Sequence, residues 1–165
     1  MPPVLRGYVG GMKIKQLAFL TLASLVTLTA SAQPPKRIPL PNSDLPISAA
    51  VWAGNTLYVS GTLDPDVKSH PDTQSQTVSL LQELQKLLAS QKLTLSDVVM
   101  MHVYLGGDPA KEGKMDFEGM MAGYRQFFGT QEQPNKPART TVQVVLPAGV
   151  RGALIEIDLV AVRPK

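Results

Sequence analysis

The chain has 165 residues, enough for one domain with a single hydrophobic core, and it contains no cysteine, which excludes disulfides, thiolate catalysis and zinc–thiolate sites. The net charge of +3 belongs to residues 1–32, which hold three of the 16 basic residues and none of the 13 acidic ones, so the remainder is neutral. The longest basic run there is Lys36-Arg37, too short for the basic patch typical of nucleic-acid-binding proteins, so no nucleic-acid partner is expected.

The first 32 residues have the order of a secretory signal peptide. Two lysines precede an apolar run at residues 17–28, and the small residues Ala30-Ser31-Ala32 follow it. This order predicts cleavage after Ala32, with Met12 as the natural start, and a mature protein that is periplasmic or secreted and has no membrane attachment. A retained membrane anchor is the alternative, but the apolar run is short for a bilayer and is interrupted by Thr and Ser.

Residues 33–48 contain five prolines and are expected to form an extended, poorly structured lead-in to a domain at residues 49–165. The domain opens with residues 50–53 and 56–62, which flank Gly54-Asn55, a two-residue loop of the kind that favours positive φ. This pattern predicts a β-hairpin.

Two helices are predicted from apolar residues at helical spacing. The first covers residues 73–91 with Asp72 or Thr73 as its N-cap, and the second covers residues 117–128 and ends at Gly129. The apolar stripes are Val78, Leu81, Leu84 and Leu88, widened by Leu80 and Leu87, in the first helix, and Phe117, Met120, Met121, Tyr124, Phe127 and Phe128 in the second.

Strands are predicted at residues 98–105, an apolar run without alternation, and in two extended runs within residues 137–161 that a Pro/Gly turn separates. The element order β-β-α-β-α-β-β predicts an α+β fold with two helices on one face of a sheet. The other face would be left bare, and a bare apolar sheet face is typical of an interface. We therefore expect a homo-oligomer.

The two runs near the C-terminus each carry one charge, Arg139 at the start of the first and Glu156 inside the second. A buried charge without a partner is costly, so each needs a partner or a ligand. If the runs pair directly through their apolar faces, with Leu146 opposite Ile155, Arg139 lies six positions from Glu156, or about 20 Å. Either the two residues then have different roles, or they meet across a subunit boundary.

Four segments resemble the Rid (YjgF-type, RidA-like) family in order and spacing: Leu57-Tyr58-Val59-Ser60-Gly61, Ser96-Asp97-Val98-Val99, Pro137-Ala138-Arg139 and Leu154-Ile155-Glu156-Ile157. The resemblance covers about residues 47–162. It implies a chorismate-mutase-like fold, a homotrimer with ligand sites in clefts between subunits, and, in the best-known branch, hydrolysis of reactive 2-imino or enamino acids to 2-keto acids and ammonia.

The resemblance also implies residue roles. Arg139 would bind the substrate carboxylate, which suits a planar, bidentate guanidinium, and Glu156 would position the attacking water. The further candidate substrate-binding residues are Ser60, Gly61, Thr141, Met121 and Tyr124. No Walker, Rossmann or nucleophile-elbow pattern occurs, and no cofactor is expected.

Three departures from the family pattern bear on activity. Deaminating members carry Tyr where this chain has Ile47, Asn where it has Met121, and often Cys where it has Thr141. Carboxylate binding is therefore better supported than deamination, and a non-catalytic binder of small carboxylates is the first alternative. An interaction protein is the second alternative, favoured only by the expected apolar surfaces, and neutral charge argues against a ribonuclease.

Other polar residues have ordinary structural interpretations. His102, in an apolar strand, is expected to be a hydrogen-bonded core imidazole. Asp64, Asp66, His70 and Asp72 could outline a metal site, but their spacing matches no ligand motif and their loop is rich in turn residues, so no metal is expected.

Overall fold

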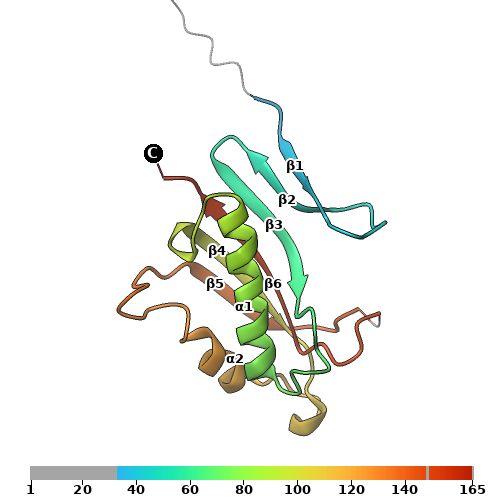
Figure 1. Cartoon of the computed structure of the whole chain (residues 1–165). Helices are drawn as coiled ribbons and strands as arrows, with labels where there is room; N and C mark the ends of the chain where they lie inside the picture. The colour runs from blue at the N-terminus through green and yellow to red at the C-terminus, as the bar shows by residue number, and fades with distance from the viewer. Residues whose placement is uncertain (1–32, 148, 165) are drawn as a thin grey trace, which may run out of the picture. The chain divides into compact units, whose positions relative to one another are not determined.

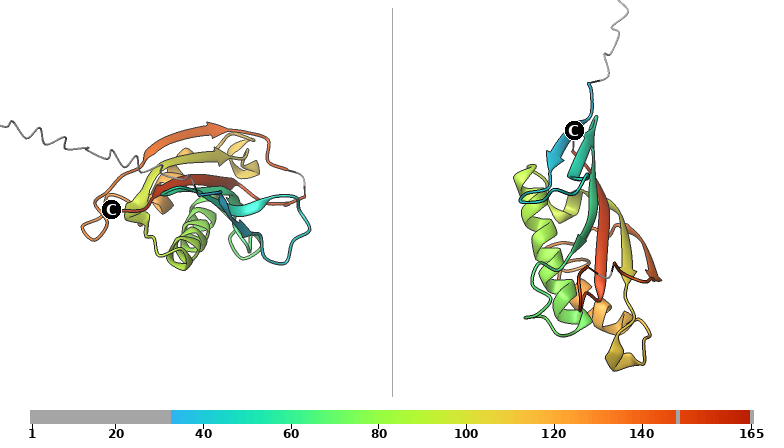
Figure 2. Two further views of the ribbon diagram at one scale, coloured as in Figure 1. Left: turned by 90° about the horizontal axis from the view of Figure 1, so that it is seen from above. Right: turned by 90° about the vertical axis from the view of Figure 1, so that its right-hand side faces the viewer.

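The computed structural model describes residues 33–147 and 149–164, and the signal peptide predicted at residues 1–32 lies outside them. The described part contains a six-stranded sheet with the strand order β1-β2-β3-β6-β4-β5. The described part also contains two α-helices. Figures 1 and 2 show them on one side of the curved sheet, so the predicted α+β fold with two helices is confirmed. The elements are β1 (Lys36–Pro39), β2 (Ser48–Ala53), β3 (Thr56–Leu63), α1 (Thr73–Ser90), β4 (Val98–Leu105), α2 (Phe117–Tyr124), β5 (Ala138–Gln143), β6 (Ile155–Val162) and the 3-10 turns Leu95–Asp97 and Pro109–Lys111.

The proline-rich segment is more ordered than the sequence predicted. Residues 36–39 form β1, which pairs antiparallel with β2 as the edge strand of the sheet. Proline is tolerated there because an edge strand has one side on which no hydrogen-bond donor is needed. The expectation of a poorly structured lead-in was therefore wrong for residues 36–39, although their predicted extended conformation is confirmed.

The first hairpin is confirmed. β2 pairs antiparallel with β3 across the loop that contains Gly54, whose φ of 59° is the left-handed conformation that glycine adopts without strain. The strand pairing places Leu57 and Val59 in the core beneath the helices.

Both predicted helices form, and the second is shorter than expected. Asp72 caps α1, because its side chain accepts a hydrogen bond from the Ser75 N–H and the Ser75 side chain reciprocates. α2 ends at Tyr124 rather than at residue 128, and the chain then continues in tighter turns, such as the Phe127 N–H bond to the Tyr124 carbonyl. No helix in the described part of the chain is long and apolar enough to cross a membrane.

The two C-terminal strands do not pair with each other, so the direct pairing considered from the sequence was wrong. β4 lies between them, parallel to β5 and antiparallel to β6. The crossover through α2 returns the chain beside β4 in the same direction, and β6 then fills the gap between β3 and β4. In this register Arg139 is opposite Met101 and Glu156 is opposite Tyr104, three positions apart along β4.

The sheet has one covered face and one face that no described element covers. Side chains such as Ile157 and Met101 are fully buried against the helices. Thr140 and Val142 of β5 point to the uncovered side, level with His102 and Tyr104, and so do not share the apolar face of Ile155. That uncovered face also exposes Tyr58, Val99 and Val162.

Candidate functional site

Arg139 lies on the helix side of the sheet, against α2. Its Nη1 is 3.2 Å from the Sδ of Met121 and 3.9 Å from the Sδ of Met120, and its guanidinium carbon lies 4.5 Å from the centre of the Tyr124 ring. Thioether sulfur is a weak acceptor, so most of the guanidinium donors are uncommitted. Among the described residues no carboxylate pairs with Arg139, in contrast to the ordinary strand-end ion pair.

The hollow beside Arg139 is positively charged. It has a volume of about 530 Å³ and is also lined by Arg125, Lys136, Tyr124 and Phe128. Burial raises the pKa of the Tyr124 hydroxyl, although the nearby Arg139 charge opposes this. Arg125 and Lys136 were not predicted from the sequence as site residues. Lys136 could have been, because it directly precedes the Pro-Ala-Arg segment.

Thr141 lies two residues after Arg139 on the same face of β5. Its Oγ1 is buried and has no hydrogen-bond partner. Buried polar atoms nearly always form a hydrogen bond. The Thr141 hydroxyl, two residues from Arg139, therefore lacks a partner that the other described residues do not supply.

Glu156 lies on the opposite, uncovered face of the sheet. It is half-buried, and Gly61 of β3 lies so close that a Cβ there would overlap Oε1 of Glu156. Gly61 is therefore needed where β3 bulges past β6. Burial raises the pKa of the Glu156 carboxyl, and the charge of Asp158 raises it further.

A hydrogen-bonded cluster continues from Glu156 along the same face. Asp158 accepts a 2.8 Å hydrogen bond from the Tyr104 hydroxyl and lies 2.7 Å from Nδ1 of His102. The hydrogen bond to Asp158 raises the pKa of Tyr104. His102 is thus hydrogen-bonded as expected, but it is half-exposed on the uncovered face and is not a core residue.

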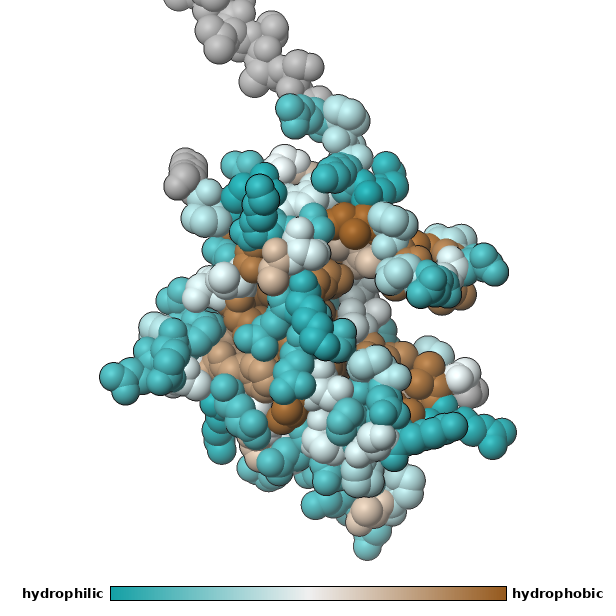
Figure 3. Space-filling model, viewed as in Figure 1, coloured by the Kyte–Doolittle hydropathy of each residue, from teal (hydrophilic) through white to brown (hydrophobic). Residues whose placement is uncertain are grey.

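Ser60 and Gly61 also border an apolar cavity of about 500 Å³ at the edge of the sheet. The Ser60 hydroxyl donates a 2.7 Å hydrogen bond to the Ser48 carbonyl, so it is committed to the backbone. Ile47, half-exposed, lines the same cavity. Figure 3 shows apolar atoms exposed on this side of the molecule. Its remaining apolar walls come from Ile38, Pro39, Leu40, Pro41, Ala49, Leu84 and Leu87.

The structure thus divides the candidate residues into two half-sites. We call the first the arginine half, formed by Arg139 with Met121, Tyr124 and Thr141. The second is the glutamate half, formed by Glu156 and Gly61. Ser60 and Ile47 belong to neither half, because the cavity that they line is also lined by α1 and so lies on the helix side of the sheet. Because opposite positions of paired strands point to the same face, Arg139 and Glu156 point to different faces, and the isolated chain does not bring them together.

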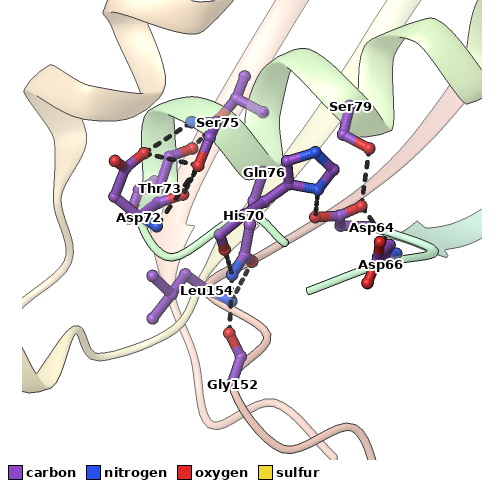
Figure 4. Close-up of polar contacts among 11 residues, drawn as sticks. Asp64, Asp66, His70, Asp72, Thr73, Ser75, Gln76, Ser79, Gly152 and Leu154 are labelled. Atoms are coloured by element: carbon purple, nitrogen blue, oxygen red, sulfur yellow. Dashed lines mark hydrogen bonds and ion pairs between the residues drawn. The ribbon is translucent and has the colours of Figure 1, made fainter. Parts of the chain in front are cut away.

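The residues considered for a metal site have structural roles instead. Figure 4 shows Asp64 with Oδ2 2.7 Å from Nδ1 of His70, and with Oδ1 accepting hydrogen bonds from the Ser79 hydroxyl and the Asp66 N–H. Asp72 is used as the helix cap. In the described ranges no three His, Asp or Glu side chains are grouped so that they could hold a metal ion.

Comparison with known proteins identifies the relatives of this chain. A family model described as "Endoribonuclease L-PSP" matches residues 40–163. A RutC family protein from Pyrococcus horikoshii is 34% identical over 121 residues, covering 70% of this chain and 86% of the relative. A RutC family protein from Haemophilus influenzae is 31% identical over 122 residues, covering 72% and 87%.

Solved structures have the same fold. A YjgF/YER057c/UK114 family member, Rv2704 from Mycobacterium tuberculosis, superposes with a TM-score of 0.61 at 23% identity, covering 79% of this chain and all of that one. TdcF from E. coli, crystallised with bound serine, superposes with a TM-score of 0.62 at 24% identity, covering 78% of this chain and all of that one.

Proposed function

The chain belongs to the YjgF/RutC/Rid family, and we propose that it binds small 2-keto and 2-imino acids in clefts between the subunits of a homotrimer and hydrolyses the imino acids to 2-keto acids and ammonia. The observation that carries this proposal is the environment of Arg139: a guanidinium without a carboxylate partner, in a hollow that also contains Arg125 and Lys136. Such a hollow favours an anion with two oxygens, because a carboxylate can accept two parallel hydrogen bonds from one guanidinium.

The homotrimer accounts for the separation of the two half-sites. In one chain Arg139 and Glu156 face opposite sides of the sheet, so a single ligand needs the arginine half of one subunit and the glutamate half of its neighbour. The uncovered sheet face, with exposed Tyr58, Val99 and Val142, supplies apolar area for such an interface. The arrangement is heterologous, and it closes into a ring when the rotation between subunits is one third of a turn.

Glu156 is the proposed base. As water adds to the imine carbon, the Glu156 carboxylate takes a proton from the water and passes it to the imine nitrogen, which gives a neutral carbinolamine. The carboxylate then transfers the hydroxyl proton of the carbinolamine to its amino group; the C–N bond breaks, ammonia leaves, and the 2-keto acid and the ionised carboxylate remain. A raised carboxyl pKa suits this role, because a general base works best when its pKa approaches the working pH. The rate is expected to rise with pH as Glu156 loses its proton.

The ligand size fits a small amino-acid-like molecule. The E. coli TdcF structure contains bound serine, which has a carboxylate next to a nitrogen-bearing carbon, as an imino acid does. The apolar cavity beside Gly61 has space for an aliphatic side chain. No cofactor is required for the hydrolysis. After removal of residues 1–32 the protein would act in the periplasm or outside the cell, without nucleic-acid or membrane partners.

A non-catalytic carboxylate binder is the second candidate. The sulfur of Met121, and not a side-chain amide, contacts the Arg139 guanidinium. Ile47, in the apolar cavity that Gly61 borders, has no polar side-chain atom for a ligand. This candidate keeps the arginine half and gives Glu156 no chemical role.

Imine hydrolysis and keto-acid binding, measured side by side, distinguish the two candidates. Ammonia release is followed from imino acids generated in situ by an amino acid oxidase, and binding of 2-oxobutanoate is followed by calorimetry. The hydrolase proposal predicts that Glu156→Gln binds 2-oxobutanoate normally but releases ammonia at the uncatalysed rate. A wild type that binds and never accelerates ammonia release establishes the binder, and a wild type that does neither overturns both.

A further inference from the structure

The C-terminal ends of α1 and β6 lie at the same end of the fold (Figure 1). Residues there line a second hollow, whose charged side chains are all basic. Its volume is about 600 Å³, and its lining includes Lys36, Lys92 and Arg163 together with Trp52. No carboxylate side chain is among its described lining residues. These cations come from parts of the sequence that are far apart, so the fold itself assembles the charge.

Each cation is placed by a backbone feature. Lys36 on β1 is paired opposite Trp52 on β2, so both side chains point to the same face. Lys92 follows the last turn of α1 in the left-handed conformation, with φ of 61°. Arg163 follows β6, and its N–H donates to the Asn55 carbonyl at 2.9 Å. In the described part of the chain none of the three cations forms an ion pair.

Arg163 is held in place by an aromatic ring. Its guanidinium carbon lies 4.2 Å from the centre of the Trp52 ring, within the range of a cation–π interaction. Trp52 is itself fixed, because it is only 6% exposed and its Nε1 donates a 3.1 Å hydrogen bond to Oε1 of Gln91. A guanidinium stacked on a fixed ring keeps its edge N–H groups free for a planar or tetrahedral oxyanion and loses little rotamer freedom on binding.

We propose that this hollow binds a small multivalent oxyanion of the phosphate monoester or pyrophosphate class. Three convergent cations without a carboxylate suit a ligand with two or more negative charges, and Arg163 supplies the oriented donors. A nucleic-acid strand is disfavoured, because residues 33–165 are neutral overall and only these three cations converge, without a basic stripe to follow a backbone. The site is independent of the keto-acid cleft.

Trp52 is the only tryptophan in the chain, so its fluorescence reports on this hollow alone. The full-length protein is titrated with inorganic pyrophosphate at constant ionic strength, with sodium chloride as the reference titration. The expected result is a saturable change in Trp52 emission, matched by calorimetry, that chloride does not reproduce. The double variant Arg163→Gln, Lys92→Asn should weaken binding at least about tenfold; Asn is chosen because it tolerates the left-handed conformation.

Lys114→Gln is the matched control, because Lys114 is an exposed lysine paired with Glu112 and lies outside the hollow. It should bind pyrophosphate as the wild type does. The proposal is overturned if pyrophosphate changes the emission no more than chloride does, if the double variant keeps wild-type affinity, or if a short RNA of equal phosphate concentration binds more tightly than pyrophosphate.

Discussion

The two half-sites differ in charge, in face and in the way each is held. The arginine half is a cationic hollow with sulfur and aromatic walls, and Arg139 there has no carboxylate partner among the described residues. The glutamate half is an acidic patch on the uncovered face, where Glu156 adjoins Asp158 and contacts Gly61. The arginine half has an excess of positive charge and the glutamate half an excess of negative charge. The difference indicates that neither half is complete, and that pairing across subunits would balance both.

Loss of the arginine half should have the largest effect. Arg139→Ala removes the two-pronged contact to a carboxylate and should weaken 2-keto-acid binding at least about 100-fold, or about 3 kcal/mol. Arg139→Lys should recover little, because an ammonium cannot donate in the same fork. Calorimetry measures the binding, and thermal melts should show little change because the contacts of the guanidinium in the unliganded protein are weak sulfur and ring contacts without an ion pair.

Arg151→Ala is the control for that prediction, since Arg151 is an exposed arginine outside the arginine half. It should bind keto acids normally. Wild-type affinity in Arg139→Ala would mean that the arginine half is not a carboxylate site, and the interaction-protein alternative would then be favoured.

Gly61→Ala tests the glutamate half without a substitution at Glu156 itself. The added Cβ overlaps Oε1 of Glu156, the end of a flexible side chain, so the carboxylate should rotate away at little cost in stability. Displacing a catalytic group by about 1 Å can lower a rate by about 100-fold, so imine hydrolysis should fall strongly while the melting temperature stays close to wild type. Unchanged hydrolysis would show that the position of Glu156 is unimportant.

Thr141→Val should stabilise the protein slightly. The buried Oγ1 of Thr141 has no partner, and burying an unpaired hydroxyl costs about 1–3 kcal/mol, whereas a methyl group of the same shape has no such cost. Urea unfolding of the unliganded protein should show a gain of about 1 kcal/mol. A loss of similar size would mean that the hydroxyl has a partner in the assembled protein.

The effect of Glu156→Gln on stability should be the smallest of these changes, and it should depend on pH. The pKa of Glu156 is raised in the folded protein, so the folded state binds its proton more tightly than the unfolded state does. Ionisation of Glu156 therefore lowers the free energy of unfolding. This loss is absent at pH values below the pKa of Glu156 in the unfolded state, and it grows as the pH rises through the pKa in the folded state. Thermal melts should therefore show the variant slightly more stable than wild type at pH 8 and equal to it near pH 4. A variant less stable at pH 8 would indicate a cation paired with Glu156 in the assembly.

The sequence predicted the elements well, because each has a strong local signal. The Gly54 turn, the Asp72 cap and the leucine spacing of α1 all depend on neighbouring residues. Strand order has no such local signal. The two C-terminal strands are close enough in sequence to suggest a hairpin, and only the crossover through α2 puts β4 between them. The end of α2 was also missed, since its apolar stripe continues through Phe128 after the helix stops at Tyr124.

The candidate site could be predicted only as a set of residues. Arg139 and Glu156 stand out as charges in apolar runs, but which face each occupies depends on the register of three strands. Contacts such as the Met121 sulfur on the guanidinium, or Gly61 against the carboxylate, depend on packing between distant segments. No sequence pattern contains that information.

Cysteine cross-linking between the two halves tests the shared cleft most directly, because the chain contains no cysteine of its own. Tyr104→Cys places a thiol opposite Glu156, in the glutamate half, and Met121→Cys places one in the arginine half. After the two variants are co-expressed and treated with a short bismaleimide, the account predicts a cross-linked dimer that contains one chain of each kind and is absent from either variant alone. If the mixture contains both chains in one trimer yet yields no such dimer, or if the protein is a monomer, the two halves do not meet and the shared cleft does not exist.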